Sequence, residues 1–433
     1  MKIKLSYGYE GLEVEINENN LLEIIEAQSA PPMSDPKKAL IESFKNPIGT
    51  ISLKEKIKSK QKICIVISDS TRAVPTQLIL EALLEELAEY GVKKEQITIL
   101  IATGLHRPNL GEELENLVGK QIKEEYRIIN HYARKKETCE LIGKTKRGTP
   151  IIIDKTFLDS DFRIITGLIE PHFMAGFSGG RKAVCPGISY LDMFKHFHGP
   201  DIVESPYSSI ANLDNNLFHL EATEIAKKAG VDFMVNVTIS KDKKITGVFS
   251  GDLEKAFDSG ALFCKETSCA NVKEEADMVI TSGGGLPLDA TFYQTVKGMV
   301  AAMPAVKKNG MIIIASECRE EIGSEEFVEL STLEKNLDEF IEKIKKPNYF
   351  KIDQWQLEEL VKARRKAEIY LYSSCMLASR HVIPETTVRI VNSVEDAIKI
   401  GLEKFGVNAT INVIADGPYT VPVIINSINN AVD

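Results

Sequence analysis

The residues most able to do chemistry lie in one polar, glycine-rich stretch, residues 167–182, and in the tripeptide His196-Phe-His198 that follows it. Three of the seven histidines of the chain fall in this region, together with Lys182. The stretch is too polar and too irregular to form a core helix. We therefore expect a reactive site to be assembled there.

Lys182 directly follows a pair of glycines and an arginine. Such glycines let the backbone approach a ligand closely with its N–H groups exposed. The run is not a phosphate-binding P-loop, because the spacing differs and Ala183 stands where a Ser or Thr is required. Two interpretations have equal weight: Lys182 contacts a phosphate or is a covalent attachment point, or it is a solvated lysine in a turn.

His196 and His198 could present two imidazoles on one side of an extended segment. A metal ion normally takes three or four protein ligands, and no carboxylate or thiolate accompanies these histidines at ligand spacing. Structural histidines are the favoured interpretation. A metal here would need most of its donors from a non-protein ligand.

Two further histidines, His106 and His172, lie in loops that follow predicted strands and are suited to two-sided proton transfer near neutral pH. Arg72 and Lys297 are cations that could fix a carboxylate, although for Lys297 alone ordinary surface charge is the better explanation. Trp355 is the only tryptophan, and it could fill a domain interface as readily as it could cover a substrate.

Two buried strands are predicted to place some of these side chains at one edge of a parallel sheet. The apolar runs 62–68 and 97–102 are separated by a helix that begins after Pro75, which makes a β-α-β unit. Asp69 and His106 follow the carboxyl ends of these strands, where ligands bind in such sheets. A further strand at 163–167 leads into the glycine-rich stretch, which is therefore expected to lie at the same edge of the sheet.

The whole pattern predicts an α/β protein of two domains, each with a mostly parallel sheet flanked by helices. The polar segment 264–275 marks the boundary between an N-terminal, cofactor-binding domain over 1–270 and a C-terminal domain over 271–406. The tail, 407–433, is expected to return to the first domain. Residues 1–20 are expected to form a β-hairpin.

The composition of the chain argues against several classes of function. The chain has 433 residues, and its net charge of -9 argues against nucleic acid as a partner. Without a secretory segment or an apolar run of membrane-spanning length, it is expected to lie in the cytoplasm. Seven scattered cysteines without a C-x-x-C pair predict reduced, mostly buried thiols.

Taken together, these pieces resemble the nickel-dependent lactate racemase family, whose members use a nickel-pincer nucleotide, over nearly the whole chain. The segments that carry the resemblance are Ser68–Arg72, Thr103–Pro108, Glu170–Lys182, His196–His198, Tyr293–Gly298 and Trp355. The order and spacing of these segments in one chain make the resemblance specific.

The resemblance implies an active site in the inter-domain cleft and a cofactor derived from nicotinic acid, pyridinium-3-thioamide-5-thiocarboxylic acid mononucleotide, which carries nickel. Lys182 would be joined to it through the thioamide, and His198 would be the protein ligand to nickel. Other residues would lie near the nucleotide: Asp69, Gly176, Gly179 and Gly180. His196 would be structural.

By the same resemblance, His106 and His172 would be the two bases. The residues that would bind the substrate are Arg72, Tyr293, Gln294, Lys297 and Trp355. The implied reaction interconverts D- and L-lactate by hydride transfer to and from the cofactor through pyruvate. Partners would be lactate and cofactor maturation proteins, with neither nucleic acid nor a membrane. The alternatives are a racemase or epimerase of another short 2-hydroxy acid, and a non-catalytic nickel or nucleotide carrier.

Overall fold

The chain folds into two compact units. The computed structural model describes residues 1–433 except 29, 59–60, 347–348, 378–382, 385–386 and 425–433. The N-terminal unit comprises Ser29–Phe197 and Ser205–Thr267. The C-terminal unit comprises Met1–Gln28, His198–Glu204 and Ser268–Asp433. The chain therefore passes from one unit to the other four times.

A six-stranded sheet forms the centre of the N-terminal unit. Its strand order is β13 (Ile245–Gly251), β12 (Phe233–Ile239), β9 (Phe162–Leu168), β4 (Ile63–Ser68), β5 (Ile97–Ala102) and β6 (Arg127–Asn130). All neighbours pair in parallel except β12 and β13, which form an antiparallel hairpin. Two small antiparallel hairpins accompany the sheet, β7 (Cys139–Lys144) with β8 (Pro150–Asp154), and β10 (Pro171–His172) with β11 (Gly176–Phe177).

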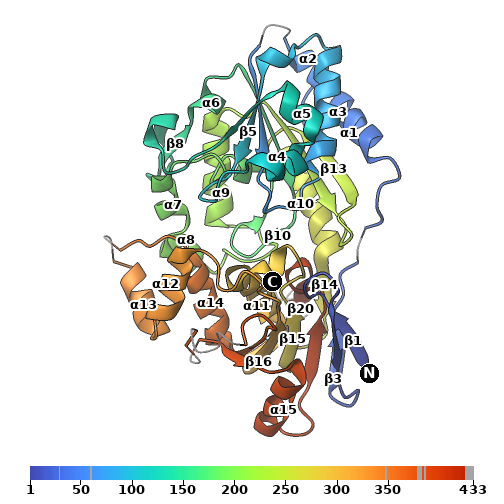
Figure 1. The fold of residues 1–433 in the computed structure, drawn as a ribbon, viewed down its shortest axis with the longest axis vertical. Coiled ribbons are helices and arrows are strands. Elements are labelled where there is room, and N and C mark those ends of the chain that lie inside the picture. The colour runs from blue at the N-terminus through green and yellow to red at the C-terminus, as the bar shows by residue number, and fades with distance from the viewer. Residues whose placement is uncertain (29, 59–60, 347–348, 378–382, 385–386, 425–433) are drawn as a thin grey trace, which may run out of the picture. The chain divides into compact units, whose positions relative to one another are not determined.

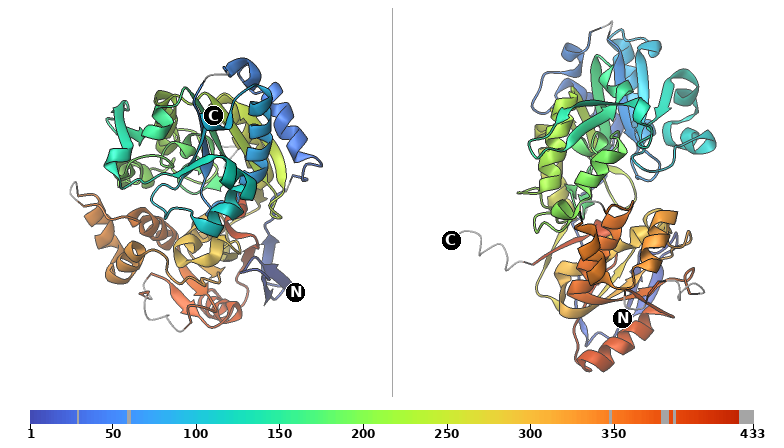
Figure 2. Two further views of the ribbon diagram at one scale, coloured as in Figure 1. Left: turned by 45° about the horizontal axis from the view of Figure 1, so that its top comes forward. Right: turned by 90° about the vertical axis from the view of Figure 1, so that its left-hand side faces the viewer.

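The continuous apolar sequence of β4 is explained by burial on both of its faces. Ile63, Ile65 and Ile67 pack into one cluster with the apolar side of the helix α3 (Thr76–Glu89), whereas the alternating residues Cys64 and Val66 are equally buried on the other side. Helices lie on either side of the sheet (Figure 2). The helices of this unit are α1 (Pro36–Lys45), α2 (Leu53–Lys56), α3 (Thr76–Glu89), α4 (Gly111–Val118), α5 (Lys120–Glu125), α6 (Lys155–Leu158), α7 (Leu191–Phe197), α9 (Leu217–Ala229) and α10 (Lys255–Ser268).

The C-terminal unit contains a second six-stranded sheet, which is parallel throughout. Its order is β18 (Arg389–Val391), β17 (Ala367–Tyr372), β16 (Val306–Ala315), β15 (Ala276–Ser282), β19 (Ile411–Ile414) and β3 (Leu21–Ile24). A separate parallel pair joins β14 (Cys269–Val272) to β20 (Val421–Ile424). The helices are α8 (Pro200–Val203), α11 (Phe292–Ala302), α12 (Glu325–Leu333), α13 (Leu337–Ile344), α14 (Gln354–Lys366) and α15 (Val394–Phe405).

The domain boundaries expected from the sequence need correction at both ends of the chain. The expected hairpin of residues 1–20 exists, as β1 (Lys2–Leu5) and β2 (Leu12–Glu15), but it belongs to the C-terminal unit. The following strand, β3, pairs with β19, and Figure 1 shows these blue N-terminal strands beside the red strands of that unit. The tail from residue 407 to 424 stays in the C-terminal unit, while 425–433 lie outside the described residues.

The fold class predicted from the sequence is confirmed: an α/β protein with two mostly parallel sheets flanked by helices. Five of the seven cysteines are buried. Among the described residues, no helix has the length and apolar character needed to cross a membrane.

Candidate active site

Asp69 and His106 meet at the carboxyl edge of the N-terminal sheet. β4 and β5 pair in register, with Ser68 opposite Ala102, so the residues that follow them leave the sheet side by side. The Nδ1 atom of His106 lies 2.7 Å from Oδ2 of Asp69. The carboxyl group of Asp69 is buried, whereas 45% of the His106 side chain is exposed. This arrangement orients the imidazole through Nδ1 and leaves Nε2 as the outward-facing nitrogen.

Neighbouring groups keep the Asp69 carboxyl ionised. Burial by itself would raise the pKa of the Asp69 carboxyl, but the hydrogen bond and charge of His106, together with Arg72 and Thr71, hold the pKa below its ordinary value. The Thr71 hydroxyl donates to the second carboxyl oxygen at 2.7 Å. Asp69 is thus an ionised partner of His106, a role that differs from the cofactor contact expected from the sequence.

His172 lies in the short hairpin of β10 and β11, where its ring is fixed from two sides. The Phe173 ring stacks on it, with centroids 4.6 Å apart. Its Nδ1 atom accepts hydrogen bonds from the backbone N–H groups of Met174 and Ala175, at 3.2 and 3.1 Å. Its Nε2 atom lies 3.0 Å from Nζ of Lys182. The structure therefore brings His172 and Lys182 into direct contact.

Arg181 stabilises the loop that carries both residues. Its guanidinium group is buried, donates to the carbonyl oxygen of Ala175 at 2.7 Å and lies over the Phe257 ring at 4.2 Å. Burial lowers the pKa of Arg181 to about 9, which still leaves the group charged at neutral pH. No sequence signal predicted this role, because an arginine between glycine and lysine normally indicates an exposed turn.

The three glycines of the stretch are needed for packing within the protein. All have a positive φ, at 74° for Gly176, 74° for Gly179 and 51° for Gly180. A Cβ atom on Gly176 would overlap the carbonyl oxygen of Asn212, and one on Gly179 would overlap the side-chain oxygen of Asn236. The same Asn236 oxygen accepts the backbone N–H of Gly180 at 2.7 Å. Close approach of a ligand is thus not required to explain these glycines.

His196 and His198 do not form a pair. The segment is not extended as predicted: α7 includes His196, which is exposed, and ends at Phe197. His198 is 7% exposed and belongs to the C-terminal unit. Its ring packs on that of Trp355, with centroids 4.3 Å apart. The two imidazoles therefore differ in burial and in the unit to which they belong.

Trp355 also connects His198 with the residues of α11. Its indole N–H donates to the Tyr293 hydroxyl at 3.1 Å, and the Tyr293 carbonyl oxygen accepts from the side chain of Gln356 at 2.5 Å. Gln294 follows on α11, and its buried side-chain oxygen accepts no hydrogen bond from any described residue. Lys297 lies on the same helix.

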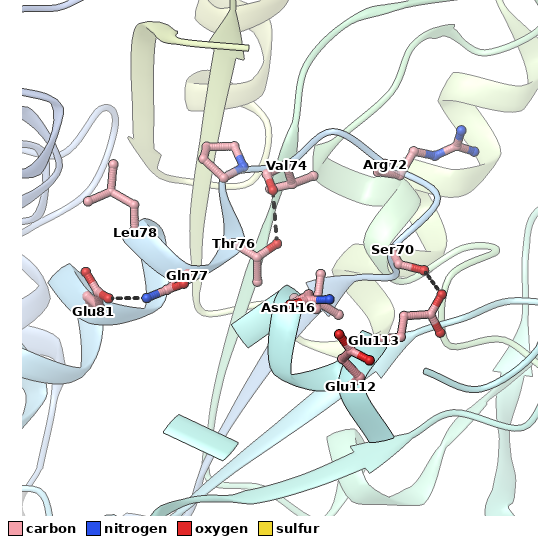
Figure 3. Close-up of a pocket in the computed structure, with 12 residues that line it drawn as sticks. Ser70, Arg72, Val74, Thr76, Gln77, Leu78, Glu81, Glu112, Glu113 and Asn116 are labelled. Atoms are coloured by element: carbon pink, nitrogen blue, oxygen red, sulfur yellow. Dashed lines mark hydrogen bonds between the residues drawn. The ribbon is translucent and has the colours of Figure 1, made fainter. Parts of the chain in front are cut away.

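Arg72 lines a cavity of about 770 Å³ beside the N-terminus of α3. In Figure 3 its side chain extends away from the acidic side chains of that cavity. Glu81, Glu112 and Glu113 also line the cavity, but none of the histidines considered above does. An acidic cavity is poorly suited to a carboxylate, so the cavity as a whole is not the candidate substrate site.

The next question is whether the side chains that commonly bind metals come together anywhere in the structure. Within the described ranges, no group of three His, Cys, Asp or Glu side chains could hold a metal ion. A bare ion therefore finds no complete site there. A cofactor that carries its own metal donors would need only one imidazole from the protein, such as that of His198 in the C-terminal unit, and its covalent attachment would need an amine, such as that of Lys182 in the N-terminal unit.

Two buried groups of ionisable residues were not predicted. The ring of His131 is fully buried, with Nδ1 2.8 Å from the Asp154 carboxylate and Nε2 3.0 Å from the Ser189 carbonyl oxygen. On α14, burial and the neighbouring carboxylates raise the pKa of Glu358 to about 9, while burial raises that of Glu359 to about 7. Charged residues give no sequence signal of burial, so only the packing could reveal these groups.

Comparison with known proteins identifies the family. A family model for the lactate racemase N-terminal domain matches residues 7–211, and one for the lactate racemase C-terminal domain matches residues 271–425. The chain is 33% identical over 419 residues to the lactate racemase of Thermoanaerobacterium thermosaccharolyticum, which covers 96% of this chain and 97% of the relative. It is also 33% identical over 419 residues to the lactate racemase of Lactiplantibacillus plantarum, covering 96% and 98% of the two chains.

Solved structures agree. The lactate racemase apoprotein of T. thermosaccharolyticum superposes with a TM-score of 0.91 at 31% identity, covering 98% of this chain and all (100%) of that one. A protein from Thermotoga maritima superposes with a TM-score of 0.69 at 17% identity, covering 92% and 99%, and shows the fold alone. From the two family models and the full-length relatives, we conclude that this chain belongs to the lactate racemase family and is an isomerase.

Proposed function

We propose that the protein interconverts D- and L-lactate with a nickel-pincer nucleotide tethered to Lys182. The observation that carries the proposal is the full-length likeness to two lactate racemases. The side-chain geometry supports it, because Lys182 lies against His172 and a second histidine, His106, is oriented by a carboxylate. Maturation proteins would supply the cofactor.

The chemistry explains why such a cofactor is needed. The α-C–H of lactate is a very weak acid, and removing its proton would leave a dianion that no ordinary side-chain base could form quickly. When bound, the cofactor supplies a hydride acceptor and donor, so that the reaction passes through pyruvate. The protein then has only to move the hydroxyl proton. Hydride returned to the opposite face of the planar ketone gives the other enantiomer.

His106 is the better prepared of the two proposed bases. Asp69 accepts the Nδ1–H of His106 in the neutral ring, which leaves Nε2 to accept the hydroxyl proton, and stabilises the imidazolium that results. His172 is proposed as the second base, because the two enantiomers place their hydroxyl groups on different sides. For this role its ring must exchange the hydrogen bonds it makes in this structure.

The remaining residues would hold the substrate and the metal. Arg72 is proposed to bind the carboxylate, and Lys297 and Gln294 to supply further polar contacts. The buried oxygen of Gln294 supports this assignment, because it has acceptor capacity to spare within the described structure. His198 is the proposed nickel ligand. Trp355 packs on the His198 ring and donates a hydrogen bond to the Tyr293 hydroxyl, so it would position both of these side chains.

Conversion of D-lactate by protein matured with the cofactor pathway tests the activity. Turnover of malate or 2-hydroxybutyrate without lactate would favour a racemase of another 2-hydroxy acid. Tight cofactor binding without any turnover would favour a carrier. Protein produced without the maturation pathway is expected to be inactive, so it cannot serve as the test material.

The variant Lys182→Ala tests the tether. Intact mass and nickel content, measured on matured protein, should show a covalent adduct with nickel in the parent protein and neither in the variant. An exposed lysine, in Lys241→Ala, provides the control and should leave both unchanged. An adduct of equal mass in Lys182→Ala would remove the proposed link.

A further inference from the structure

The loops that carry Asp69 and His106 are bound to one carboxylate, that of Glu113. Ser70 directly follows Asp69, and its hydroxyl group donates to Oε1 of Glu113 at 2.9 Å. Arg107 directly follows His106, and its guanidinium group donates to both carboxyl oxygens of Glu113, at 2.6 and 2.8 Å. Chiefly through the hydrogen bonds of Arg107, the pKa of Glu113 is lowered to about 2, so this group is ionised at neutral pH. One charged group on α4 therefore binds the chain neighbours of both members of the pair.

Asn109, which is buried, is a second link between the loops. Its Oδ1 atom accepts the backbone N–H of Ser70 at 3.2 Å, and its Nδ2 atom donates to the Ser70 hydroxyl at 2.8 Å and to Oε2 of Glu113 at 2.9 Å. The side chain of Asn130, the last residue of β6, accepts the Asn109 backbone N–H at 2.9 Å and donates to the Asn109 carbonyl oxygen at 3.0 Å. The loop after β4 is thus tied through Asn109 to the edge of the sheet.

The donors and acceptors of this network match one another. The Ser70 hydroxyl accepts from Asn109 and donates to Glu113. Each carboxyl oxygen of Glu113 accepts one hydrogen bond from Arg107 and one from another side chain. A glutamine in place of Glu113 would turn one of these oxygens into an NH₂ group, which can only donate and would face other donors. The network therefore needs the carboxylate itself and not only a side chain of its size.

We propose that Asn109 and Glu113 are positioning residues, which hold the loops after β4 and β5 at the spacing that the hydrogen bond between Asp69 and His106 requires. This inference rests on the proposed function, in which Nε2 of His106 takes the hydroxyl proton. The bonds of the network to Ser70 and to Arg107 are bonds to the chain neighbours of the pair, so the effect on the imidazole passes through the loops. A reacting group misplaced by about 1 Å can lose about 100-fold in rate, so a small displacement of either loop is sufficient.

The isosteric variant Glu113→Gln tests the inference in matured protein. It should lower kcat/KM for both enantiomers of lactate by about 10- to 100-fold, because the His106 ring is no longer held in place. The nickel content and the intact mass should stay at the values of the parent protein. The control is Glu112→Gln, which removes the same charge from the adjacent, exposed position of α4 and should leave the rate nearly unchanged.

A second background separates positioning from a general loss of structure. The variant Asp69→Ala removes the group that His106 is bonded to, so there is no longer a bond for the network to maintain. In this background Glu113→Gln should cost less than about threefold, since residues that act through one contact are not additive. Ser70→Ala removes only the bridging hydroxyl and should show the same pattern with a smaller loss, of about 3- to 10-fold, in the otherwise unchanged protein. It serves in place of Glu113→Gln if that variant does not fold.

The ring nitrogens of His106 give a readout that does not depend on activity. The ionised Asp69 carboxylate can only accept, so the neutral His106 ring must carry its proton on Nδ1. An imidazole that is free in water prefers the Nε2–H form. Nitrogen NMR of cofactor-free protein distinguishes the two forms, at a pH where the ring is neutral, and the signal is assigned by its loss in His106→Gln. The parent protein and Glu112→Gln should show the Nδ1–H form, whereas Glu113→Gln should show a larger share of Nε2–H.

Two results would overturn the inference. One is an equal loss of activity from Glu113→Gln with and without Asp69→Ala. The other is an unchanged Nδ1–H form in both Glu113→Gln and Ser70→Ala. Failure of the proposed function is a separate result, in which matured parent protein does not racemise lactate, and the comparison of ring forms in cofactor-free protein then decides the inference.

Discussion

Replacing Asp69 with Asn separates two roles for this residue, since the sequence resemblance places it near the nucleotide and the structure places it on His106. The carboxylate accepts a hydrogen bond from His106 at 2.7 Å and is itself buried. A hydrogen bond to a charged group is worth about 1.5–3 kcal/mol. If this stabilisation applies to the imidazolium formed when His106 takes the hydroxyl proton, its loss lowers the rate by about 10- to 150-fold.

The effect should appear in kcat/KM for both enantiomers, because one histidine takes the proton in one direction and returns it in the other. The assay is racemisation of L- and D-lactate by matured protein, with nickel content measured on the same sample. Thr71→Val, which removes only the hydroxyl bonded to the other carboxyl oxygen, should change the rate by less than about 5-fold.

Two results would refute the reasoning. Activity of Asp69→Asn within about threefold of the parent would show that the carboxylate does not support a base. A fall in activity matched by an equal fall in nickel would instead assign Asp69 to the cofactor. The stability of the variant must be measured as well, because the ionised Asp69 carboxylate also stabilises the fold. Its pKa is lower in the folded protein than the value of about 3.9 in the unfolded chain, so this contribution is present above about pH 3.9 and is lost as the pH falls through the pKa of the folded protein.

Three further predictions concern the supporting residues. Trp355→Leu should lower the nickel content of matured protein by removing the ring that packs on His198, whereas Trp355→Phe should largely retain it and lose only the bond to Tyr293. The raised pKa of Glu358 predicts that urea-unfolding stability falls as the pH rises between 4.5 and about 9, and Glu358→Gln should remove about 2 kcal/mol of the change between pH 6 and 8. Gly179→Ala should lower the thermal midpoint even without cofactor, because its φ is 74° and a Cβ would overlap a neighbouring amide oxygen.

Much of the local structure could be predicted, because the relevant signals are local. The strand over 63–68 is a continuous apolar run, as burial on both faces requires. The helix predicted at 217–229 has these bounds because the Asn216 side chain caps its first turn and Gly230 ends it in a left-handed conformation. Each of these signals lies within a few residues of the element it defines.

The assignment of strands to sheets could not be predicted in the same way. An apolar strand such as β3 or β19 is compatible with either sheet, since its periodicity describes burial and not the partner strand. The seven residues His198–Glu204 belong to the C-terminal unit, and side chains far along the chain hold them there. Lys362 donates to the Val203 carbonyl oxygen at 3.0 Å, and Arg365 bonds to Glu204 at 2.9 Å. Such pairs leave no local pattern.

Prediction from the sequence is limited in the same way for single residues of the candidate site. Sequence reasoning selected His106, His172 and Lys182 by type and position, but the hydrogen bonds between side chains give them distinct properties. Both rings are held through Nδ1, but by different groups: the Asp69 carboxylate faces Nδ1 of His106, whereas backbone N–H groups donate to Nδ1 of His172, and Nε2 of His172 contacts Lys182. The two proposed bases are alike in residue type, but in this structure their imidazoles have different partners, Asp69 for His106 and Lys182 for His172.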